Sequence, residues 1–443
     1  MTRLLFAIPI ILLPFAYYFP VNIVVPGMNL TNLLLILLVC GLFFGRHDPA
    51  HLAVRGFLGA PLFGLFAVLL LGFVIAQWHD LSQIDDDLAS LKNAIVYPPL
   101  YFIYRRCRQD LRGTRQLIVL VLVIAVIAGM QAVYQGIQFG FSAYSGLQRA
   151  VGPFGGIKQA NRAGVFFAMF LPMLVAVALQ FRHRRLVRLA AITGGVILVM
   201  AILFTYSRQS YLIALFAIMV LLLRRSLAAA VLAALLIITC ASVLPPSVID
   251  RIQETGQVEA GGGAVELDTS TTSRFEIWMG AREMLRDHPM GVGLDRFPKY
   301  IGQYTSRPRV DAHNAFVLIL AECGPLGLMA MLWLFWRMWL LARWLRRSAG
   351  TTRPEASTLA IGFTLTVVSM ALGNLYGSPF FQGLIMANFW ILCGLMERYG
   401  TIKAHAAKIA YGMPAVPIPM FQRFPLVARA LPGLAMIRKP PLP

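Results

Sequence analysis

One histidine at the start of an apolar segment has the side chain best suited to acid–base chemistry. His313 lies between Asp311 and Asn314, and a long apolar run begins directly after it. An imidazole titrates near neutral pH, so it can remove a proton from a hydroxyl group. We therefore predict a general base at His313, with Asp311 and Asn314 as supporting residues. The alternative is a polar residue that only marks the membrane boundary.

Four basic side chains are spaced so that they could bind an anion. Arg208 lies in a very short turn between two apolar runs, and Arg274 follows a polar stretch. Lys158 and Arg162 lie in a glycine-rich segment on either side of Asn161. A guanidinium offers a planar pair of donors that matches phosphate oxygens. These residues predict a phosphate site with Asn161 in support. The alternatives are a membrane anchor or an ion pair with the acidic loop for Arg208, an ordinary solvated helix residue for Arg274, and a simple re-entrant turn for the glycine-rich segment.

Arg274 is predicted to open a helix over residues 274–287. Ser273 and Glu276 have the spacing of a capping box, in which the serine caps the helix and the glutamate is its third residue. The free N–H groups and the dipole of a first helical turn favour an anion. This placement strengthens the expectation that Arg274 contacts a phosphate group.

Glu322 is a carboxylate inside the apolar run that follows His313. Ionisable groups within membrane spans are functional candidates by default. Nine helical steps separate Glu322 from His313 and place it on the opposite face, so we do not expect a direct contact between them. A structural hydrogen bond to a neighbouring helix is the alternative. The Gly324-Pro325 pair is predicted to kink this span.

The elements that position these residues are predicted to be membrane helices. The chain has 443 residues, of which 58% are hydrophobic and 13% are charged, whereas a soluble domain carries about 25% charged residues. Apolar runs of about 20 residues, the length that crosses a bilayer, recur along the chain. We predict an all-α polytopic membrane protein of the GT-C glycosyltransferase type with about twelve spans. These spans are 4–20, 29–45, 57–77, 88–104, 116–138, 163–181, 189–205, 209–223, 227–244, 314–341, 356–376 and 380–397.

The formal net charge of +20 is explained by topology rather than by nucleic-acid binding. Basic residues cluster in alternate loops and acidic residues in the others, as the positive-inside rule requires. Both termini are therefore predicted to be cytoplasmic, and the segment 245–313 is predicted to be a periplasmic loop of a bacterial inner-membrane protein. We expect one membrane domain over residues 1–397. A basic, proline-rich tail over 398–443 follows, with 421–438 on the inner leaflet.

The polar loop has little that could bind a metal or a nucleotide. The five cysteines are scattered, and none lies between residues 245 and 313. Their spacing does not fit a metal site, and the chain lacks a nucleotide-binding P-loop. We therefore expect no cofactor and no metal. Residues 255–270 are glycine-rich and predicted to be flexible.

The chain resembles the O-antigen ligase family of membrane glycosyltransferases over about residues 145–395. His313-Asn314 is followed after nine residues by Gly324-x-x-Gly327, which is similar to the family's histidine motif. Arg208 and Leu212 have the spacing of its Arg-x3-Leu motif. The loop that contains Arg274 and the Gly-Pro-Phe-Gly stretch before the sixth span also agree with the family.

This resemblance implies a lipid-linked-glycan transferase at the periplasmic face of the inner membrane. Its donor would be a glycan on undecaprenyl diphosphate and its acceptor lipid A-core or a growing glycan, without an obligatory metal. Arg208 and Arg274 would bind the diphosphate, and His313 would activate or position the acceptor hydroxyl, with inversion at the anomeric carbon. The leading hypothesis is an O-antigen ligase.

Three alternatives stay open at this point. A polysaccharide polymerase or a protein O-oligosaccharyltransferase has the same motifs. The large soluble C-terminal domain of some protein-glycosylating relatives is missing here, which weighs slightly against that branch. A twelve-span solute transporter is a different class of protein. Transporters place their polar sites near the bilayer midplane, whereas the polar residues of this chain cluster at the outer boundary, which disfavours transport.

Overall fold

A computed structural model describes most of the chain. The described residues are 2–19, 30–43, 56–79, 84–107, 109–140, 148–181, 184–240, 269–348 and 354–410. All regular elements in these ranges are helices, as the sequence predicted. The flexible stretch predicted at 255–270, apart from its last two residues, and the leaflet segment predicted at 421–438 lie outside these ranges.

The apolar runs fold into helices because a bilayer leaves backbone groups without water as a partner. Six helices in the described ranges are long and apolar enough to cross a membrane: α3 (Gly59–His79), α6 (Leu111–Phe139), α7 (Ala160–Gln180), α8 (Arg185–Phe204), α14 (Ala315–Ser348) and α15 (Pro354–Gly373). Others are α1 (Thr2–Leu12) with η1 (Leu13–Tyr18), α2 (Leu30–Phe43), α9 (Arg208–Leu223), α10 (Leu227–Cys240) and α16 (Gly383–Ala410). The protein is a multi-pass membrane protein. Twelve spans and cytoplasmic termini stay predictions.

The prediction of a single span at 88–104 is wrong. This segment forms two helices, α4 (Ile84–Val96) and the short α5 (Leu100–Arg105), separated by a bend at Tyr97 and a turn at Pro98 and Pro99. Proline removes an N–H donor and also disfavours helical geometry in the residue before it. α4 is amphipathic and begins with acidic residues, so it does not have the composition of a spanning helix.

The predicted start of the loop helix is also wrong. α12 (Thr269–Asp287) begins before Ser273, so Ser273 and Arg274 lie inside the helix. The Glu276 carboxylate does not form a capping box, because it accepts hydrogen bonds from the backbone N–H of Ser306 at 3.1 Å and from its hydroxyl at 2.6 Å. Tertiary contacts therefore override the local capping pattern, and the helix-dipole argument for Arg274 does not apply.

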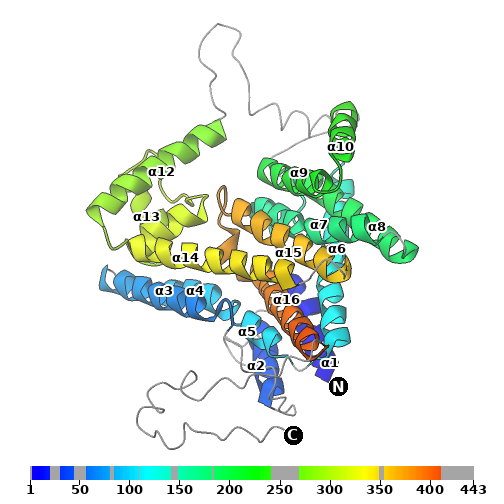
Figure 1. The fold of residues 1–443 in the computed structure, drawn as a ribbon. Coiled ribbons are helices and arrows are strands. Elements are labelled where there is room, and N and C mark those ends of the chain that lie inside the picture. Colours follow the sequence, from blue (N-terminus) through cyan, green and yellow to red (C-terminus); the bar gives the residue numbers. More distant parts are fainter. Residues whose placement is uncertain are drawn as a thin grey trace, which may run out of the picture.

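Residues 269–312 form a small helical subdomain on one end of α14. It contains α12, α13 (Phe297–Tyr300) and η6 (Ile301–Gln303), and α12 and α13 contact α14. Its own apolar core gathers the buried side chains Ile277, Ala281, Met284, Val292, Phe297 and Ile301. Figure 1 shows this subdomain beside the start of α14, away from α6 and α8.

The predicted kink in α14 is confirmed at Gly324, whose φ is 65° and ψ −168°. Pro325 has no N–H, so the carbonyl of Ala321 loses its helical donor. The backbone N–H of Val292 replaces that donor at 2.9 Å, and the N–H of Gly293 donates to the carbonyl of Glu322 at 3.0 Å. A loop of the helical subdomain therefore packs against the kink and supplies the missing hydrogen-bond donors.

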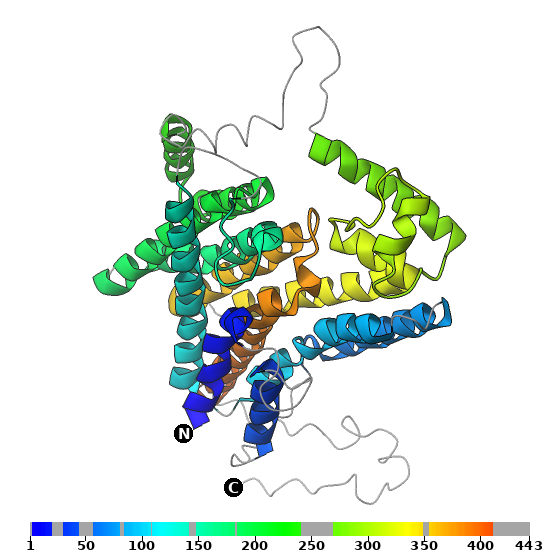
Figure 2. The same cartoon turned by 180° about the vertical axis from the view of Figure 1, so that it is seen from behind.

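The remaining helices surround α14, α15 and α16. α3 and α4 lie side by side along α14, whereas α7, α8 and α9 lie beyond α15 (Figures 1 and 2). α16 extends to Ala410, so the helix passes the boundary that the sequence analysis placed at residue 397. The starts of α7 and α9 face the same turn between α15 and α16, and this turn meets the start of α14.

Candidate functional site

His313 lies in a tight turn directly before α14. Its φ of 49° is in the left-handed region, which is uncommon for a residue with a side chain. Its backbone N–H donates to Oδ1 of Asp311 at 3.4 Å. Oδ1 of Asn314 accepts the N–H groups of Phe316 at 2.9 Å and Val317 at 3.2 Å, so Asn314 caps α14. The cap and the aspartate together fix the backbone that carries the imidazole.

The environment of His313 favours a neutral imidazole. Burial lowers its pKa most strongly, and the positive charges of Arg274 and Arg162 lower it further, whereas the negative charge of Asp311 raises it. The net direction is downward. A neutral imidazole can accept a proton at physiological pH, which a general base requires.

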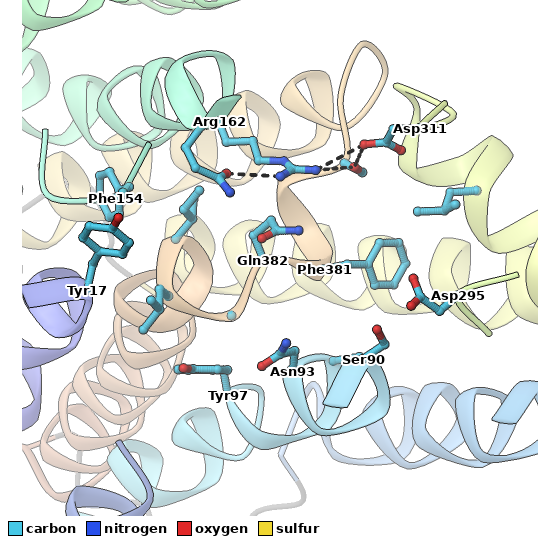
Figure 3. Close-up of a pocket in the computed structure, with 18 of the residues that line it drawn as sticks. Tyr17, Ser90, Asn93, Tyr97, Phe154, Arg162, Asp295, Asp311, Phe381 and Gln382 are labelled. Carbon is cyan, nitrogen blue, oxygen red and sulfur yellow. Dashed lines mark hydrogen bonds and ion pairs between the residues drawn. The ribbon is translucent and has the colours of Figure 1, made fainter. Parts of the chain in front are cut away.

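Arg162 and Asp311 form an ion pair beside this turn. Nη2 of Arg162, in the first turn of α7, lies 3.1 Å from Oδ2 of Asp311 (Figure 3). The hydroxyl of Ser378 donates to the same carboxylate oxygen at 3.1 Å. Oε1 of Gln159 accepts from the other terminal nitrogen of Arg162 at 3.1 Å. The guanidinium is therefore already oriented by protein groups.

Arg274 stacks on an aromatic ring instead of pairing with a carboxylate. Its Cζ lies 3.8 Å from the centre of the Tyr376 ring, and the edge of Trp278 packs on the same ring at 6.3 Å between centres. Trp278 also donates its Nε1–H to the carbonyl of Ala312 at 2.9 Å. The Nε of Arg274 is buried without a hydrogen-bond partner. Among the residues that the structure describes, no carboxylate pairs with Arg274, so its charge is available to an anion.

Arg208 is the first residue of α9 and lies near the same turn. The side chain of the next residue, Gln209, donates to the carbonyls of Leu372 at 3.0 Å and Gly373 at 2.7 Å, at the end of α15. The backbone N–H of Ala315, two residues after His313, donates at 3.0 Å to carbonyls of the turn that follows. The end of α15 and the turn after it therefore hold both the start of α9 and the turn that contains His313.

The other predicted residues have different placements. Oδ1 of Asn161 accepts from Nη2 of Arg149 at 2.5 Å, so Asn161 is engaged in a local hydrogen bond. Lys158 is exposed on η4 (Ile157–Gln159) and is outside the Arg162 ion-pair cluster as far as the described residues show. Oε1 of Glu322 accepts the backbone N–H of Phe297 at 3.4 Å. Glu322 therefore serves the helical subdomain, and within the described ranges it does not contact His313.

A cavity of about 730 Å³ adjoins this cluster. Arg162, Asp311 and Ser378 form one end of it, and Glu322 also lines it. Figure 3 shows further polar and aromatic side chains from four other parts of the chain. These side chains are Ser90, Asn93 and Tyr97 of α4 and its turn, Tyr17 and Phe154 beside α1, Asp295 of the helical subdomain, and Phe381 and Gln382 before α16. The size is in the range of small-molecule sites.

Sequence reasoning missed the contribution of the turn between α15 and α16. Tyr376 and Ser378 contact Arg274 and the Asp311–Arg162 pair, respectively. The available signal was the Gly-Ser-Pro interruption after Tyr376, which falls between the predicted spans 356–376 and 380–397. Across the described ranges, no group of three or more His, Cys, Asp or Glu side chains is placed to hold a metal ion.

Comparison with known proteins identifies part of this arrangement. A family model described as O-antigen ligase matches residues 193–332. The matched segment contains Arg208, Arg274, His313 and Glu322, but it ends before the Tyr376 turn and begins after Arg162. The resemblance stated from the motifs is therefore confirmed for this part of the chain. A search of curated proteins found no match.

Proposed function

We propose that this protein is an O-antigen ligase, which transfers a glycan from undecaprenyl diphosphate to lipid A-core at the periplasmic face of the inner membrane. The proposal rests on Arg274, which has no carboxylate partner among the described residues, and on the nearby His313, whose pKa is lowered by burial. Arg274 stacks 3.8 Å from the Tyr376 ring centre and its positive charge acts on His313. Both residues lie in the segment that matches the O-antigen ligase model.

The proposed reaction is a displacement at the anomeric carbon. The acceptor hydroxyl oxygen attacks that carbon while its proton passes to the imidazole of His313. The bond from the carbon to the diphosphate oxygen breaks, and its electron pair stays on the diphosphate. Arg274 and Arg208 stabilise that developing charge, and fixed donors of this type commonly contribute several kcal/mol to catalysis. Attack opposite the leaving group inverts the anomeric configuration.

Arg162 and Asp311 have a positioning role in this proposal. Asp311 accepts the backbone N–H of His313 with one oxygen and binds Arg162 and Ser378 with the other. This arrangement fixes the backbone that carries the imidazole. Lys158 is exposed, so we assign it at most a contact with the outer part of the donor diphosphate.

A deletion strain tests the proposed transfer. We expect lipopolysaccharide gels to show bare core, with long glycans left on undecaprenyl diphosphate. Core that carries a single repeat, or loss of a free exopolysaccharide, would instead identify a polymerase. An unchanged set of glycans would reject both transferase functions and favour transport.

Substitutions in the reintroduced protein test the residues. We expect His313→Ala and Arg274→Ala each to reduce transfer at least 100-fold, the scale of losing a base or an anion-stabilising donor, while membrane levels stay normal. His288→Ala and Arg282→Ala are matched controls, because both residues belong to the helical subdomain and Arg282 is exposed. Wild-type transfer by a stably inserted His313→Ala protein would refute the assigned base.

A further inference from the structure

The cavity continues from the ion pair of Arg162 and Asp311 to a wall formed by α4. Asn93 of α4 and Gln382 before α16 present amide side chains to this space (Figure 3). Within the described residues, neither amide side chain has a hydrogen-bond partner. An amide both donates and accepts hydrogen bonds, so the two side chains match the hydroxyl groups of a sugar ring. Phe381 and Tyr97 add aromatic surface against which such a ring can pack.

The charges on the lining distinguish this space from the diphosphate site. Arg162 is the one basic side chain among the described lining residues, and it is already paired with Asp311. Asp295 and Glu322 add two further carboxyl groups to the wall. A carboxylate or phosphate that entered would therefore find, among the described lining residues, no unpaired basic side chain to offset its loss of water. This lining favours a neutral ligand over an anionic one.

The position of α4 is fixed independently of any ligand. Nη2 of Arg296 lies 2.6 Å from Oδ2 of Asp87, and both side chains are 2% exposed or less. This pair connects α4 to the helical subdomain. It places Ser90 and Asn93, one and two helical turns further along from Asp87, on the wall of the cavity.

We propose that this cavity is a saccharide subsite for an uncharged sugar, in which Asn93 and Gln382 hydrogen-bond ring hydroxyls. The proposal rests on the transferase function above and adds a specificity: the sugar beside α4 carries no carboxylate or phosphate. The sugar comes either from the lipid-linked donor or from the acceptor, since both present hydroxyl-rich rings. The diphosphate of the donor then lies outside the cavity, on the side of Arg274.

Saturation-transfer NMR on the detergent-purified full chain tests the sugar class. The probes are the methyl glycosides of glucose, galactose, mannose and N-acetylglucosamine, compared with those of glucuronic and galacturonic acid. We expect at least one neutral glycoside to give a signal five-fold or more above either uronide. Asn93→Ala and Gln382→Ala should each reduce that signal at least five-fold. Lys92→Ala, on the exposed side of the same helix, should leave it unchanged.

Three results would overturn the subsite. They are equal signals from uronides and neutral glycosides, no signal from any glycoside, and a signal that survives both amide substitutions. The glycoside measurement does not depend on transfer, and His313→Ala should keep the signal. A transferase that binds no glycoside here would therefore refute the subsite alone, whereas glycoside binding without transfer would refute the proposed function alone.

A photocrosslinker at position 93 distinguishes the two sources of the sugar. With benzoylphenylalanine in place of Asn93, irradiated cells should yield the protein joined to undecaprenyl-linked glycan or to lipid A-core. The first product identifies the donor sugar, and the second identifies the acceptor sugar. A protein joined to neither, while the same crosslinker at position 382 is also unreactive, would contradict the proposal.

Discussion

His313 keeps a left-handed backbone conformation that costs about 1 kcal/mol or more for a residue with a side chain. The neighbouring residues offset this cost, because Asn314 caps α14 and the N–H of Ala315 is bound by the turn after α15. Strain of this kind persists only where the surroundings define the position of the residue. The direction of the imidazole is therefore set by main-chain geometry and burial.

The lowered pKa of His313 predicts the pH profile of transfer. A base must be neutral, so activity is present above the pKa of the imidazole and is lost as the pH falls through it. Burial lowers that pKa, so we expect the acidic limb of kcat/KM below the usual histidine value of about 6.5. Initial rates between pH 4.5 and 8 measure it.

Asp311→Asn gives this profile a second test. The negative charge of Asp311 raises the pKa of His313, so its removal should move the acidic limb to still lower pH. Intrinsic fluorescence over the same range separates loss of fold from loss of activity. A limb above pH 6.5, or a shift in the opposite direction, would contradict the assignment of His313 as the base.

The Arg162–Asp311 pair predicts non-additive substitutions. If Arg162 acts through Asp311, then Arg162→Ala combined with Asp311→Asn should be no worse than the more damaging single change. We expect a coupling free energy of about 1 kcal/mol, since the pair is partly exposed. Initial rates of the wild type, the two single variants and the double variant give this coupling free energy through a double-mutant cycle. Simple additivity would instead indicate that Arg162 contacts substrate independently.

At the scale of elements, the break in α14 depends on a close approach between two backbones. A Cβ on Gly291 would lie 2.4 Å from the carbonyl oxygen of Glu322, and Gly291 has a φ of +90°. The loop that donates hydrogen bonds to the interrupted helix therefore needs glycine at position 291 to approach the backbone of α14. The same loop leads to Asp295 and the cavity.

Gly291→Ala should destabilise the protein by more than 2 kcal/mol, because backbone strain and a backbone clash add. Gly140→Ala is the matched control, since Gly140 has a similar φ of +83° with no neighbouring atom within 4 Å. Its ψ of 162° places it in a region that only glycine occupies readily, so backbone strain alone should cost about 1–3 kcal/mol. Thermal unfolding in detergent compares the two proteins. Equal Tm values would show that the close approach contributes nothing.

Predictability from sequence also differs between elements. The apolar runs and the Gly324-Pro325 break were predictable, because membrane burial and proline act locally. Pro98 and Pro99 signal the division between α4 and α5, but the hydrophobicity of 88–104 favours a single span. The true start of α12 was not predictable from a capping pattern, since Glu276 bonds Ser306 through tertiary contact. Tyr376 reaches Arg274 only through the fold, so sequence spacing could not reveal that contact.

At the scale of the whole molecule, one buried ion pair joins the membrane helices to the helical subdomain. Asp87 and Arg296 are almost fully buried, and Gln77 of α3 donates to the same Asp87 oxygen at 2.7 Å. The consecutive helices α3 and α4 thus meet the distant Arg296 segment at one carboxylate. Removal of one charge leaves the other buried without its partner.

Asp87→Asn should therefore lower stability by about 3–5 kcal/mol, seen as a reduced Tm of the purified protein. Adding Arg296→Met to this variant removes the second buried charge and should restore part of the loss. Asp86→Asn, on the exposed face of the same helix, is the control. A double variant less stable than Asp87→Asn would show that Arg296 has other essential contacts.

The order of these segments in the chain has a consequence for membrane insertion. The loop that donates hydrogen bonds at the break in α14 is synthesised before α14 itself. Val292 and Gly293 supply the hydrogen bonds that Ala321 and Glu322 need, and they precede those residues in the chain. The donors therefore leave the ribosome before the broken helix that needs them. Each exposed carbonyl in lipid would cost several kcal/mol. The interrupted helix can thus be completed as it is inserted, without waiting for α15 or α16.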